Sequence, residues 1–433
     1  FVPLTENVVN MYVCGPTVYN YIHIGNARSA VAFDTIRRYF EYCGYTVNYI
    51  SNFTDVDDKI IKAANEAGIS TKELSDKFIA AFMEDTGQLG IKPATQNPRV
   101  INYMDEIIAF VSTLVDKGFA YVSEGDVYFR VAKSNNYAKL ANKTLEDLEI
   151  GASGRTDAET ERKENPLDFA LWKAAKEGEV SWDSPWGPGR PGWHIECSVM
   201  ATEILGDTID IHGGGADLEF PHHTNEIAQS EAKTGKTFAN YWMHNGFVNV
   251  DNEKMSKSLG NFVTVHDMLQ TVDGQVLRFF LATQQYRKPI NFTEKAIHDA
   301  EVNLKYLKNT HSLPLTEQVN QAELQTYLDA FQEAMDDDFN TANGVTVLFD
   351  MAKWINSGNY DQTVKDAFEK MLQVFGIVFE EEVLDEDIEK LIEERQAARA
   401  NKDFATADRI RDELAAQGIK LLDTKEGVRW TRD

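Results

Sequence analysis

The chain has 433 residues, a length that corresponds to roughly two to four domains. Its 69 acidic and 43 basic residues give a net charge of −26, which excludes a surface built for non-specific nucleic-acid binding. Three cysteines exclude a disulfide scaffold and favour reduced thiols in a cytoplasmic protein. No apolar run approaches the ~20 residues of a membrane span, and the first residues show no secretory leader pattern.

The first predicted elements form a strand–helix–strand unit. The apolar run 11–13 predicts a buried strand, and residues 27–40 place apolar side chains at the spacing of an amphipathic helix. We expect Asn26 to cap this helix and Gly44 to end it. A second strand over 46–53 completes a βαβ unit, which predicts a parallel sheet. In such folds, ligands bind at the carboxyl edge of the sheet.

The middle of the chain interrupts this sheet. Helices are expected between residues 59 and 120, and a hairpin over 121–131. We interpret the polar, irregular segment 134–191 as an insertion between two halves of one sheet, in which Trp182 and Trp186 pack rather than bind ligands. Beyond it we expect helices over 194–206 and 221–235 and strands over 207–215 and 241–250.

Helices dominate from about residue 265 onward. The acidic run 379–387 predicts a boundary before the last two helices and a small hairpin. Residues 390–433 hold ten basic and nine acidic residues, so this tail is far less acidic than the rest of the chain. Such a tail is compatible with a nucleic-acid partner that is contacted in patches. The candidate contacts are Arg395, Arg399, Arg409 and Arg429, although charged helical residues are more often only solvated.

Four separated residues carry metal-ligand chemistry. Cys14 ends the first strand, and Cys197 lies in the helix expected after the insertion. His222 and Glu226 are four positions apart, so they share one face of a helix. Two sulfurs, one nitrogen and one carboxylate oxygen make a tetrahedral zinc set, whereas Mg and Ca prefer oxygen ligands. The spacing alone leaves open the alternative that both cysteines are core residues and that His222 packs or caps.

Three other residues bear on this hypothesis. On a regular helix His223 is turned about 100° away from His222, which directs it away from the set. His194 is a rival ligand because it lies close to Cys197 in the sequence. Cys43, in the apolar last turn of the first helix, is expected to be a core residue.

Two short motifs indicate phosphate binding. Residues 23–26, His-Ile-Gly-Asn, open a helix after a strand, and a helix N-terminus attracts phosphate through its N–H groups and dipole. Residues 254–258, Lys-Met-Ser-Lys-Ser, carry Lys254 and Lys257, which can hold polyphosphate and stabilise charge moving onto pyrophosphate. Either motif alone could be an ordinary capped helix or an exposed basic turn. Their order around a split parallel sheet is more specific.

The two motifs resemble the HIGH and KMSKS signatures of class I aminoacyl-tRNA synthetases. Within that class, MYVCGPTVYNYIHIGNAR, NFTDVDDKI, GRPGWHIECS, HGGGADLEFPHHTNEIAQS and DNEKMSKSLGNF resemble the cysteinyl-tRNA synthetase family. The resemblance spans essentially the whole chain. One residue departs from the signature, because Asn26 replaces its second His. An amide can donate a hydrogen bond but cannot gain charge, which excludes a cationic role there.

The resemblance implies an enzyme that activates L-cysteine with ATP and transfers it to the 3′ end of tRNA(Cys). It implies one zinc ion that takes the substrate thiolate and is held by Cys14, Cys197, His222 and Glu226. The residues implied to contact cysteine are Gly15, Thr54 and Trp193. Those implied to contact ATP and its Mg are His23, Gly25, Asn26, Asp217 and Lys257. Those implied to act in catalysis are His23, Asn26, Lys254 and Lys257. A metal separates thiol from hydroxyl by acidity, so no editing domain is expected.

The implied fold is α/β. A Rossmann-like parallel-sheet catalytic domain, split by an insertion, is expected to precede an α-helical domain and a small mixed α/β tail domain. The expected boundaries are 1–104 and 187–233 for the catalytic halves, 105–186 for a connective insertion on the acceptor-end side, 234–304 for a KMSKS-bearing stem-contact region, 305–385 for a helical bundle and 386–433 for an anticodon-binding domain. We expect a cytoplasmic monomer without membrane contact.

Two rival functions stay open at this point. A cysteine-activating ligase with a small amine acceptor would share all of these active-site residues. The long helical tail and the less acidic end of the chain argue against it, since a small acceptor needs neither. A non-enzymatic zinc- and nucleotide-binding protein is the other rival, and it would not catalyse cysteine-dependent ATP–pyrophosphate exchange.

Overall fold

The computed structural model describes residues 1–152, 161–256, 258–380, 385–425 and 427–432. The chain divides into two compact units. Phe1–Leu307 and Leu315–Ile377 form the first, and Lys308–Pro314 and Val378–Asp433 form the second. Each unit is described by itself.

A parallel sheet lies at the centre of the first unit. Its strands follow the order β2 (Thr46–Ser51), β1 (Val8–Val13), β7 (Ile209–Gly215) and β8 (Ala239–Asn245). In the register, Val13 at the end of β1 lies opposite Ser51 of β2 and Gly213 of β7. All three pairings are parallel, as predicted, so the carboxyl ends of the strands meet at one edge.

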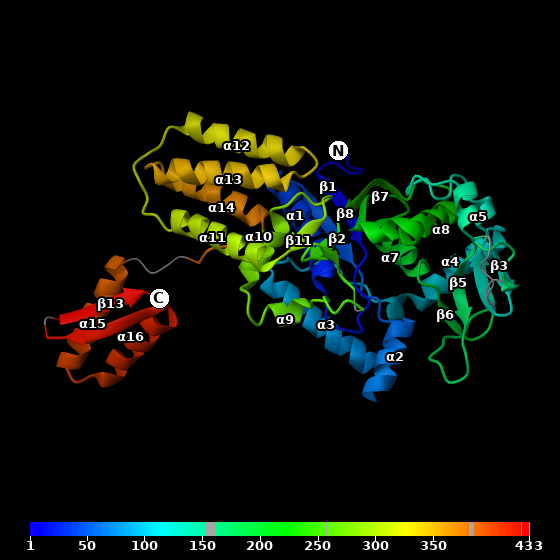
Figure 1. Ribbon diagram of the computed structural model, residues 1–433, viewed down its shortest axis with the longest axis horizontal. Helices are drawn as coiled ribbons and strands as arrows, with labels where there is room; N and C mark the ends of the chain where they lie inside the picture. The colour runs from blue at the N-terminus through cyan, green and yellow to red at the C-terminus, as the bar shows by residue number, and fades with distance from the viewer. Residues whose placement is uncertain (153–160, 257, 381–384, 426, 433) are drawn as a thin grey trace. The chain divides into compact units, whose positions relative to one another are not determined.

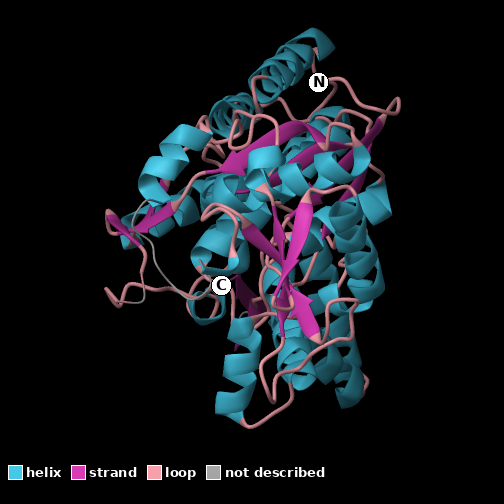
Figure 2. Ribbon diagram, turned by 90° about the vertical axis from the view of Figure 1, so that its right-hand side faces the viewer, coloured by secondary structure: helices cyan, strands magenta, loops and turns pink. Residues whose placement is uncertain are grey.

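Helix α1 (Ile24–Tyr42) joins β1 to β2 and covers one face of this sheet (Figure 1). Side chains of a strand alternate between its faces. Met11 of β1 packs in a cluster with Phe33 of α1, whereas Tyr12 belongs to the cluster that contains α7 (Ile195–Leu205) and α8 (Thr224–Thr234). Figure 2 shows the strands in magenta among the helices that cover them. The predicted βαβ unit is confirmed.

The segment between β2 and β7 carries helices and a second sheet. Its elements are α2 (Asp58–Ala67), α3 (Thr71–Gln88), α4 (Met104–Asp116), β3 (Ala120–Ser123), β4 (Asp126–Phe129), α5 (Leu145–Ala152), β5 (Phe169–Ala174), β6 (Gly189–Pro191) and α7. The four strands form one antiparallel sheet in chain order. The expected helices and hairpin are confirmed. So is the interpretation as an insertion, because β7 returns to pair with β1.

The prediction that 134–191 is irregular is wrong in part. Strand β5 pairs with β4, and its Leu171 and Trp172 are completely buried. A strand of six residues surrounded by polar sequence leaves too short an alternating pattern to be recognised. Trp182 and Trp186 pack against the same core, as expected.

Helices dominate the chain after β8, as predicted. The elements are β9 (Val248–Val250), β10 (Glu253–Lys254), α9 (Val265–Met268), α10 (Gly274–Ala282), β11 (Ile290–Phe292), α11 (Glu294–His311), α12 (Gln321–Asp336), α13 (Thr341–Asn356) and α14 (Gln362–Val374). The fully buried Arg278 of α10 contacts Asp34 of α1 at 2.6 Å and donates to the Phe375 carbonyl after α14 at 2.9 Å. A buried ion pair therefore ties α1 to the helices that follow the sheet.

The second unit is small. It contains α15 (Asp385–Ala400), α16 (Phe404–Ala416) and the antiparallel hairpin of β12 (Ile419–Thr424) and β13 (Gly427–Arg432), which confirms the helices and hairpin expected there. Its core consists of Ile388, Ile392, Ile410, Leu414 and Ile419. Among the described residues of the whole chain, no helix combines the length and the apolar character that crossing a membrane requires.

Candidate active site

One cavity of about 600 Å³ opens at the carboxyl edge of the parallel sheet. Of the site residues expected from sequence, it is lined by Cys14, Gly15, His23, Gly25, Asn26, Thr54, Trp193, Cys197, Asp217, His222 and Lys254. Glu226 is fully buried and contacts Cys14 and His222 of this wall. Lys257 lies outside the described residues. The expected residues therefore converge on one place, with the position of Lys257 undescribed.

The metal-ligand residues expected from sequence form one cluster, here called the first donor set: Cys14, Cys197, His222 and Glu226. Their candidate ligand atoms all lie within 4.8 Å of one another. The Cys14 sulfur lies 3.6 Å from the sulfur of Cys197 and 3.6 Å from Nε2 of His222. Tetrahedral zinc with ordinary bond lengths separates such ligand atoms by roughly 3.4–3.8 Å. The first donor set therefore fits a zinc ion in both atom types and spacing.

The separation between the His222 and Glu226 ligand atoms is shorter than these values. Nε2 of His222 lies 3.1 Å from Oε2 of Glu226, and the Cys14 sulfur lies 3.7 Å from the same oxygen. A separation near 3 Å is that of a direct hydrogen bond. Cys14 follows β1, and Cys197 lies in the first turn of α7. Glu226 lies in the first turn of α8.

His223 also faces the cluster, contrary to the expectation that it turns away. The expectation compared His223 with His222 alone, but His223 is three positions before Glu226, and residues three apart are neighbours on the surface of a helix. Nε2 of His223 lies 3.5 Å from the Cys14 sulfur. Both neighbouring histidines therefore reach the same sulfur, His222 from four and His223 from three positions before Glu226.

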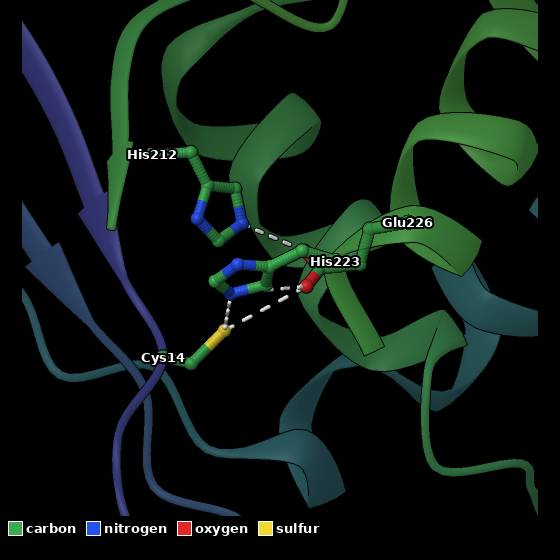
Figure 3. A group of neighbouring side chains, drawn as sticks. All are labelled: Cys14, His212, His223 and Glu226. Carbon is green, nitrogen blue, oxygen red and sulfur yellow. Dashed lines mark hydrogen bonds and ion pairs between the residues drawn. The ribbon is translucent and has the colours of Figure 1, made fainter. Parts of the chain in front are cut away.

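A second donor set consequently overlaps the first. It comprises Cys14, His212, His223 and Glu226, with ligand atoms again within 4.8 Å of one another (Figure 3). His212 of β7 contacts Oε1 of Glu226 at 2.8 Å, and Nδ1 of His223 lies 2.8 Å from Nε2 of His244. Because His212 holds one Glu226 oxygen, it positions the carboxyl group that belongs to both sets.

The two remaining expectations concern His194 as a rival metal ligand and Cys43 as a core residue. His194 is absent from both donor sets found among the described residues, and its Nδ1 lies 3.1 Å from Nδ1 of His222. Burial, with a smaller effect of His222, lowers the pKa of His194 to about 3, so the ring is neutral. Cys43 is exposed, and the prediction of a core residue is wrong. It follows the last turn of α1 as the C-cap, beyond the part of the helix that packs.

Electrostatics favour anionic donors in the first set. The hydrogen bond from Cys14 lowers the pKa of the Cys197 thiol to about 6 despite its burial. Burial raises the pKa of the Cys14 thiol well above its ordinary value, with Cys197 adding to the effect. Burial opposes the charge on Glu226, but His212 and His222 outweigh it and hold the pKa of that carboxyl below its ordinary value. One thiolate and one carboxylate at neutral pH suit a site for a cation.

His222 is also affected. Burial disfavours the charged ring, but Glu226 and Cys197 outweigh it and raise the pKa of His222 to about 10. A ligand nitrogen must be deprotonated, so metal binding here releases a proton.

The two phosphate motifs come together at the start of α1. Ile24 donates its N–H to the Val263 carbonyl, and Val265 donates to that of Ile22, so the segment that follows Lys-Met-Ser-Lys-Ser pairs with the helix entrance through an isolated bridge. His23, not Asn26, is the N-cap, and the expectation for Asn26 is corrected. Asn26 at the third position completes a capping box, donating its N–H to Nδ1 of His23.

This capping box determines which nitrogen of the His23 ring carries the proton. Because Nδ1 accepts a hydrogen bond, the neutral ring carries its proton on Nε2, which makes that atom a donor. A Cβ atom at Gly25 would lie 2.8 Å from the ring, so only glycine allows this packing. Lys254 lies in β10, with its ammonium group 6.0 Å from the Phe247 ring centroid.

Sequence reasoning missed Glu196, which stands directly before Cys197 and lines the cavity. Its Oε1 accepts a hydrogen bond from the Thr54 hydroxyl at 3.2 Å. Burial, with the Cys197 sulfur adding to it, raises the pKa of Glu196 well above its ordinary value, so an unbalanced negative charge is disfavoured there. Adjacency to a ligand cysteine was the one available signal.

Ion pairs within the second unit involve the candidate residues Arg395, Arg399 and Arg409. Arg395 and Arg399 both contact Asp423 at 3.3 Å, and the Arg395 side chain is largely buried. Arg409 pairs with Glu413 one helical turn away.

Comparisons with known proteins agree across the chain. Residues 1–302 match the family profile described as the tRNA synthetases class I (C) catalytic domain, residues 330–380 match the DALR domain, and residues 381–430 match the cysteinyl-tRNA ligase anticodon binding domain. A cysteine–tRNA ligase of Streptococcus thermophilus (strain CNRZ 1066) is 95% identical over the whole chain and 97% of its own length. One of Streptococcus pyogenes serotype M6 is 84% identical over the same shares.

Solved structures share the fold at low sequence identity. Methionyl-tRNA synthetase of Mycobacterium tuberculosis, in complex with methionyl-adenylate, superimposes with a TM-score of 0.63 at 15% identity, covering 85% of this chain and 89% of its own. A structure described as a putative arginyl-tRNA synthetase from Campylobacter jejuni gives a TM-score of 0.54, with coverages of 85% and 90%. The parallel sheet with its covering helices is therefore the class I synthetase fold.

Proposed function

Since the chain belongs to the cysteinyl-tRNA synthetase family of class I and is thus a cysteine–tRNA ligase, we propose that it selects cysteine through the first donor set. The observation that carries the proposal is that three residues of this set line the cavity that also receives the N-terminus of α1, with Glu226 buried behind them. A zinc ion bound there would supply a soft Lewis acid that accepts a thiolate in preference to a hydroxyl group.

The protein residues define the shape of the cysteine pocket. Gly15 approaches Asn52 so closely that a Cβ atom there would lie 1.7 Å from the Asn52 carbonyl oxygen, which leaves the turn after β1 without a side chain. Trp193 contacts the His222 ring with a centroid separation of 4.7 Å. Its indole and the Thr54 hydroxyl line the cavity beside the donors and bound the space for a small side chain.

ATP binds on the other side of the cavity in this proposal. The N–H groups at the start of α1 and Nε2 of His23 face the phosphates, and Asn26 holds the His23 ring through the capping box. Gly25 and Asp217 complete the nucleotide site, with Mg bound to the triphosphate. Lys254 and Lys257 supply ammonium groups that neutralise charge on the departing pyrophosphate.

The reaction has two steps. The cysteine carboxylate attacks the α-phosphorus of ATP, and the bond to pyrophosphate breaks. The ribose hydroxyl at the 3′ end of tRNA then attacks the carbonyl carbon of the adenylate, and AMP leaves. The protein contributes mainly by holding the two substrates in line and by stabilising charge.

The remaining regions contact tRNA(Cys) in this proposal. Residues 105–186 lie on the acceptor-end side, 234–304 contact the stem, 305–385 form a helical bundle, and 386–433 bind the anticodon. The matches to the DALR and anticodon binding domains support the last two assignments. We place the enzyme in the cytoplasm as a monomer.

Acceptor specificity is tested by offering purified enzyme tRNA(Cys) or small amines with cysteine and ATP. We expect charging of tRNA and no amide product. Amide formation without tRNA charging would favour the small-amine ligase instead.

Amino-acid selection is tested by ATP–pyrophosphate exchange and X-ray absorption at the zinc edge. We expect exchange with cysteine but not serine, and an additional Zn–S bond when cysteine is present. Exchange in metal-free enzyme would contradict the proposed selection by the first donor set.

A further inference from the structure

Glu196 is a buried carboxyl group that the proposed mechanism has not used. It lies in the first turn of α7, next to Cys197, and it is 2% exposed while lining the cavity. Thr54 donates to its Oε1 at 3.2 Å. Among the described residues, no basic side chain forms an ion pair with it. A carboxyl group has about four acceptor positions, so most of its capacity is available to a ligand.

Neighbouring hydrogen bonds fix the direction of the Thr54 proton. The Gly15 N–H donates to Oδ1 of Asn52 at 2.9 Å, and Nδ2 of Asn52 donates to the Thr54 hydroxyl at 3.1 Å. Because Thr54 accepts from Asn52, its single proton is directed to Glu196. This chain orients the carboxyl group without neutralising it.

Two other charged groups that line the cavity are paired. Asp34 contacts Arg278 at 2.6 Å and Arg38 at 2.8 Å. Lys92 forms an ion pair with Glu41. Glu196 therefore differs from these two lining residues in having a carboxyl group that forms no ion pair among the described residues.

We propose that Glu196 binds the α-ammonium group of the substrate cysteine. The proposal rests on the proposed function, in which the substrate thiol lies at the first donor set. Two carbon atoms separate the sulfur of cysteine from its nitrogen, so a thiol held there brings the ammonium group beside Cys197, where Glu196 lies. The ammonium group supplies three donors and the missing positive charge, which makes a charge-assisted hydrogen bond. The substrate carboxylate is then left to face the nucleotide.

The experiment separates ammonium recognition from thiol recognition. L-Cysteine and 3-mercaptopropionate, which lacks only the amino group, are titrated by calorimetry into the zinc-loaded full chain. Glu196→Gln keeps the size of the side chain and an oxygen for Thr54 but removes the charge. Glu203→Gln, at an exposed position of the same helix, is the matched control.

We expect Glu196→Gln to weaken L-cysteine binding about 10- to 100-fold while 3-mercaptopropionate changes by less than about threefold. Glu203→Gln should alter neither affinity, and zinc content should stay at the wild-type level in both variants. Glu196→Asp retains the charge and should recover part of the cysteine affinity.

Two results would overturn the assignment. Equal weakening of both ligands by Glu196→Gln would make the residue a support of the pocket. An ammonium-dependent loss in Asp217→Asn, but not in Glu196→Gln, would assign the ammonium group to Asp217. Failure of the underlying function looks different, because wild-type enzyme would then bind serine as well as cysteine.

Discussion

Cys14 and Cys197 are 183 positions apart, yet their sulfurs lie 3.6 Å from each other at the end of β1. His222 and Glu226 complete a set whose spacing fits tetrahedral zinc. His212 contacts the Glu226 oxygen that faces away from Cys14. Such outer contacts commonly orient metal ligands. At the scale of single residues, the first donor set therefore consists of four side chains, and the buried His212 orients one of them, Glu226.

Cys197→Ala should remove zinc binding and cysteine activation together, because the set loses the thiol whose pKa is lowered to about 6. The measurements are zinc per chain by elemental analysis and cysteine-dependent ATP–pyrophosphate exchange, and we expect exchange to fall by at least about 100-fold. Cys43→Ala serves as the control, since that thiol is exposed and outside both donor sets. Retained exchange in a zinc-free Cys197→Ala protein would refute selection by the metal.

Lys257→Ala should lower the rate of cysteine activation by roughly 10²–10³-fold with a modest change in the KM for cysteine. The reason is that an ammonium group acting on pyrophosphate stabilises the transition state more than the bound amino acid. Steady-state exchange kinetics measure both constants. Lys236→Ala, at a surface lysine paired with Asp207, is the control. A large rise in KM at an unchanged kcat would place Lys257 at the amino acid instead.

At the scale of elements, helix α1 connects the capping box at the cavity with a buried ion pair to α10. Its N-terminus carries the capping box of His23 and Asn26, and its middle carries the buried Asp34. Arg278 of α10 contacts that carboxylate, donates to the Phe375 carbonyl, and donates to the Thr35 hydroxyl at 3.1 Å. The position of α1, whose N-terminus faces ATP in the proposed mechanism, therefore depends on a buried guanidinium group from a later part of the chain.

Arg278→Met should destabilise the protein by about 3–5 kcal/mol, because it removes the fully buried one of the two guanidinium groups that contact the buried Asp34. Urea unfolding followed by circular dichroism measures the loss. Arg287→Met is the matched control, since the ion pair of Arg287 with Asp338 is exposed and contributes about 0–1 kcal/mol. Similar losses in the two variants would show that the buried pair has no special role.

At the scale of the whole molecule, the chain divides into a large unit that holds the entire cavity and a small one with its own apolar core. The matched domains follow the same order, with the catalytic profile over 1–302 and the anticodon binding profile over 381–430. In the proposed mechanism, amino-acid activation uses only residues of the large unit, and the small unit is needed only when tRNA is the substrate.

Ending the chain after Ile377 should therefore leave cysteine-dependent ATP–pyrophosphate exchange near the wild-type rate. Charging of tRNA(Cys) should fall by roughly 10- to 1,000-fold in kcat/KM, since each single-stranded base held by a protein contributes about 1–3 kcal/mol. Both assays are run on the same preparation, so exchange serves as the folding control. Unchanged charging would show that the tail does not bind the anticodon.

The amino-acid sequence alone determined the elements with long periodic patterns and the residues that gather at the cavity. Strands that share a parallel sheet end at one edge, so Cys14 and Thr54 could be assigned to one edge before any coordinates, whereas Asp217 was assigned through the family resemblance. Helical periodicity likewise identified α1 and the helices after β8. Local patterns sufficed there because each depends on neighbours a few positions away.

Only the tertiary structure decided what depends on irregular backbone or on distant partners. Nε2 of His223 lies 3.5 Å from the Cys14 sulfur, and helical periodicity cannot show a contact between residues 209 positions apart. Strand β5 is too short for its pattern to be seen, and pairing with β4 defines it. Glu196 became a candidate because Thr54, 142 positions away, orients its carboxyl group in the cavity wall. The tertiary fold brings side chains that are distant in the sequence into contact, and these contacts decide their hydrogen bonds and their charge.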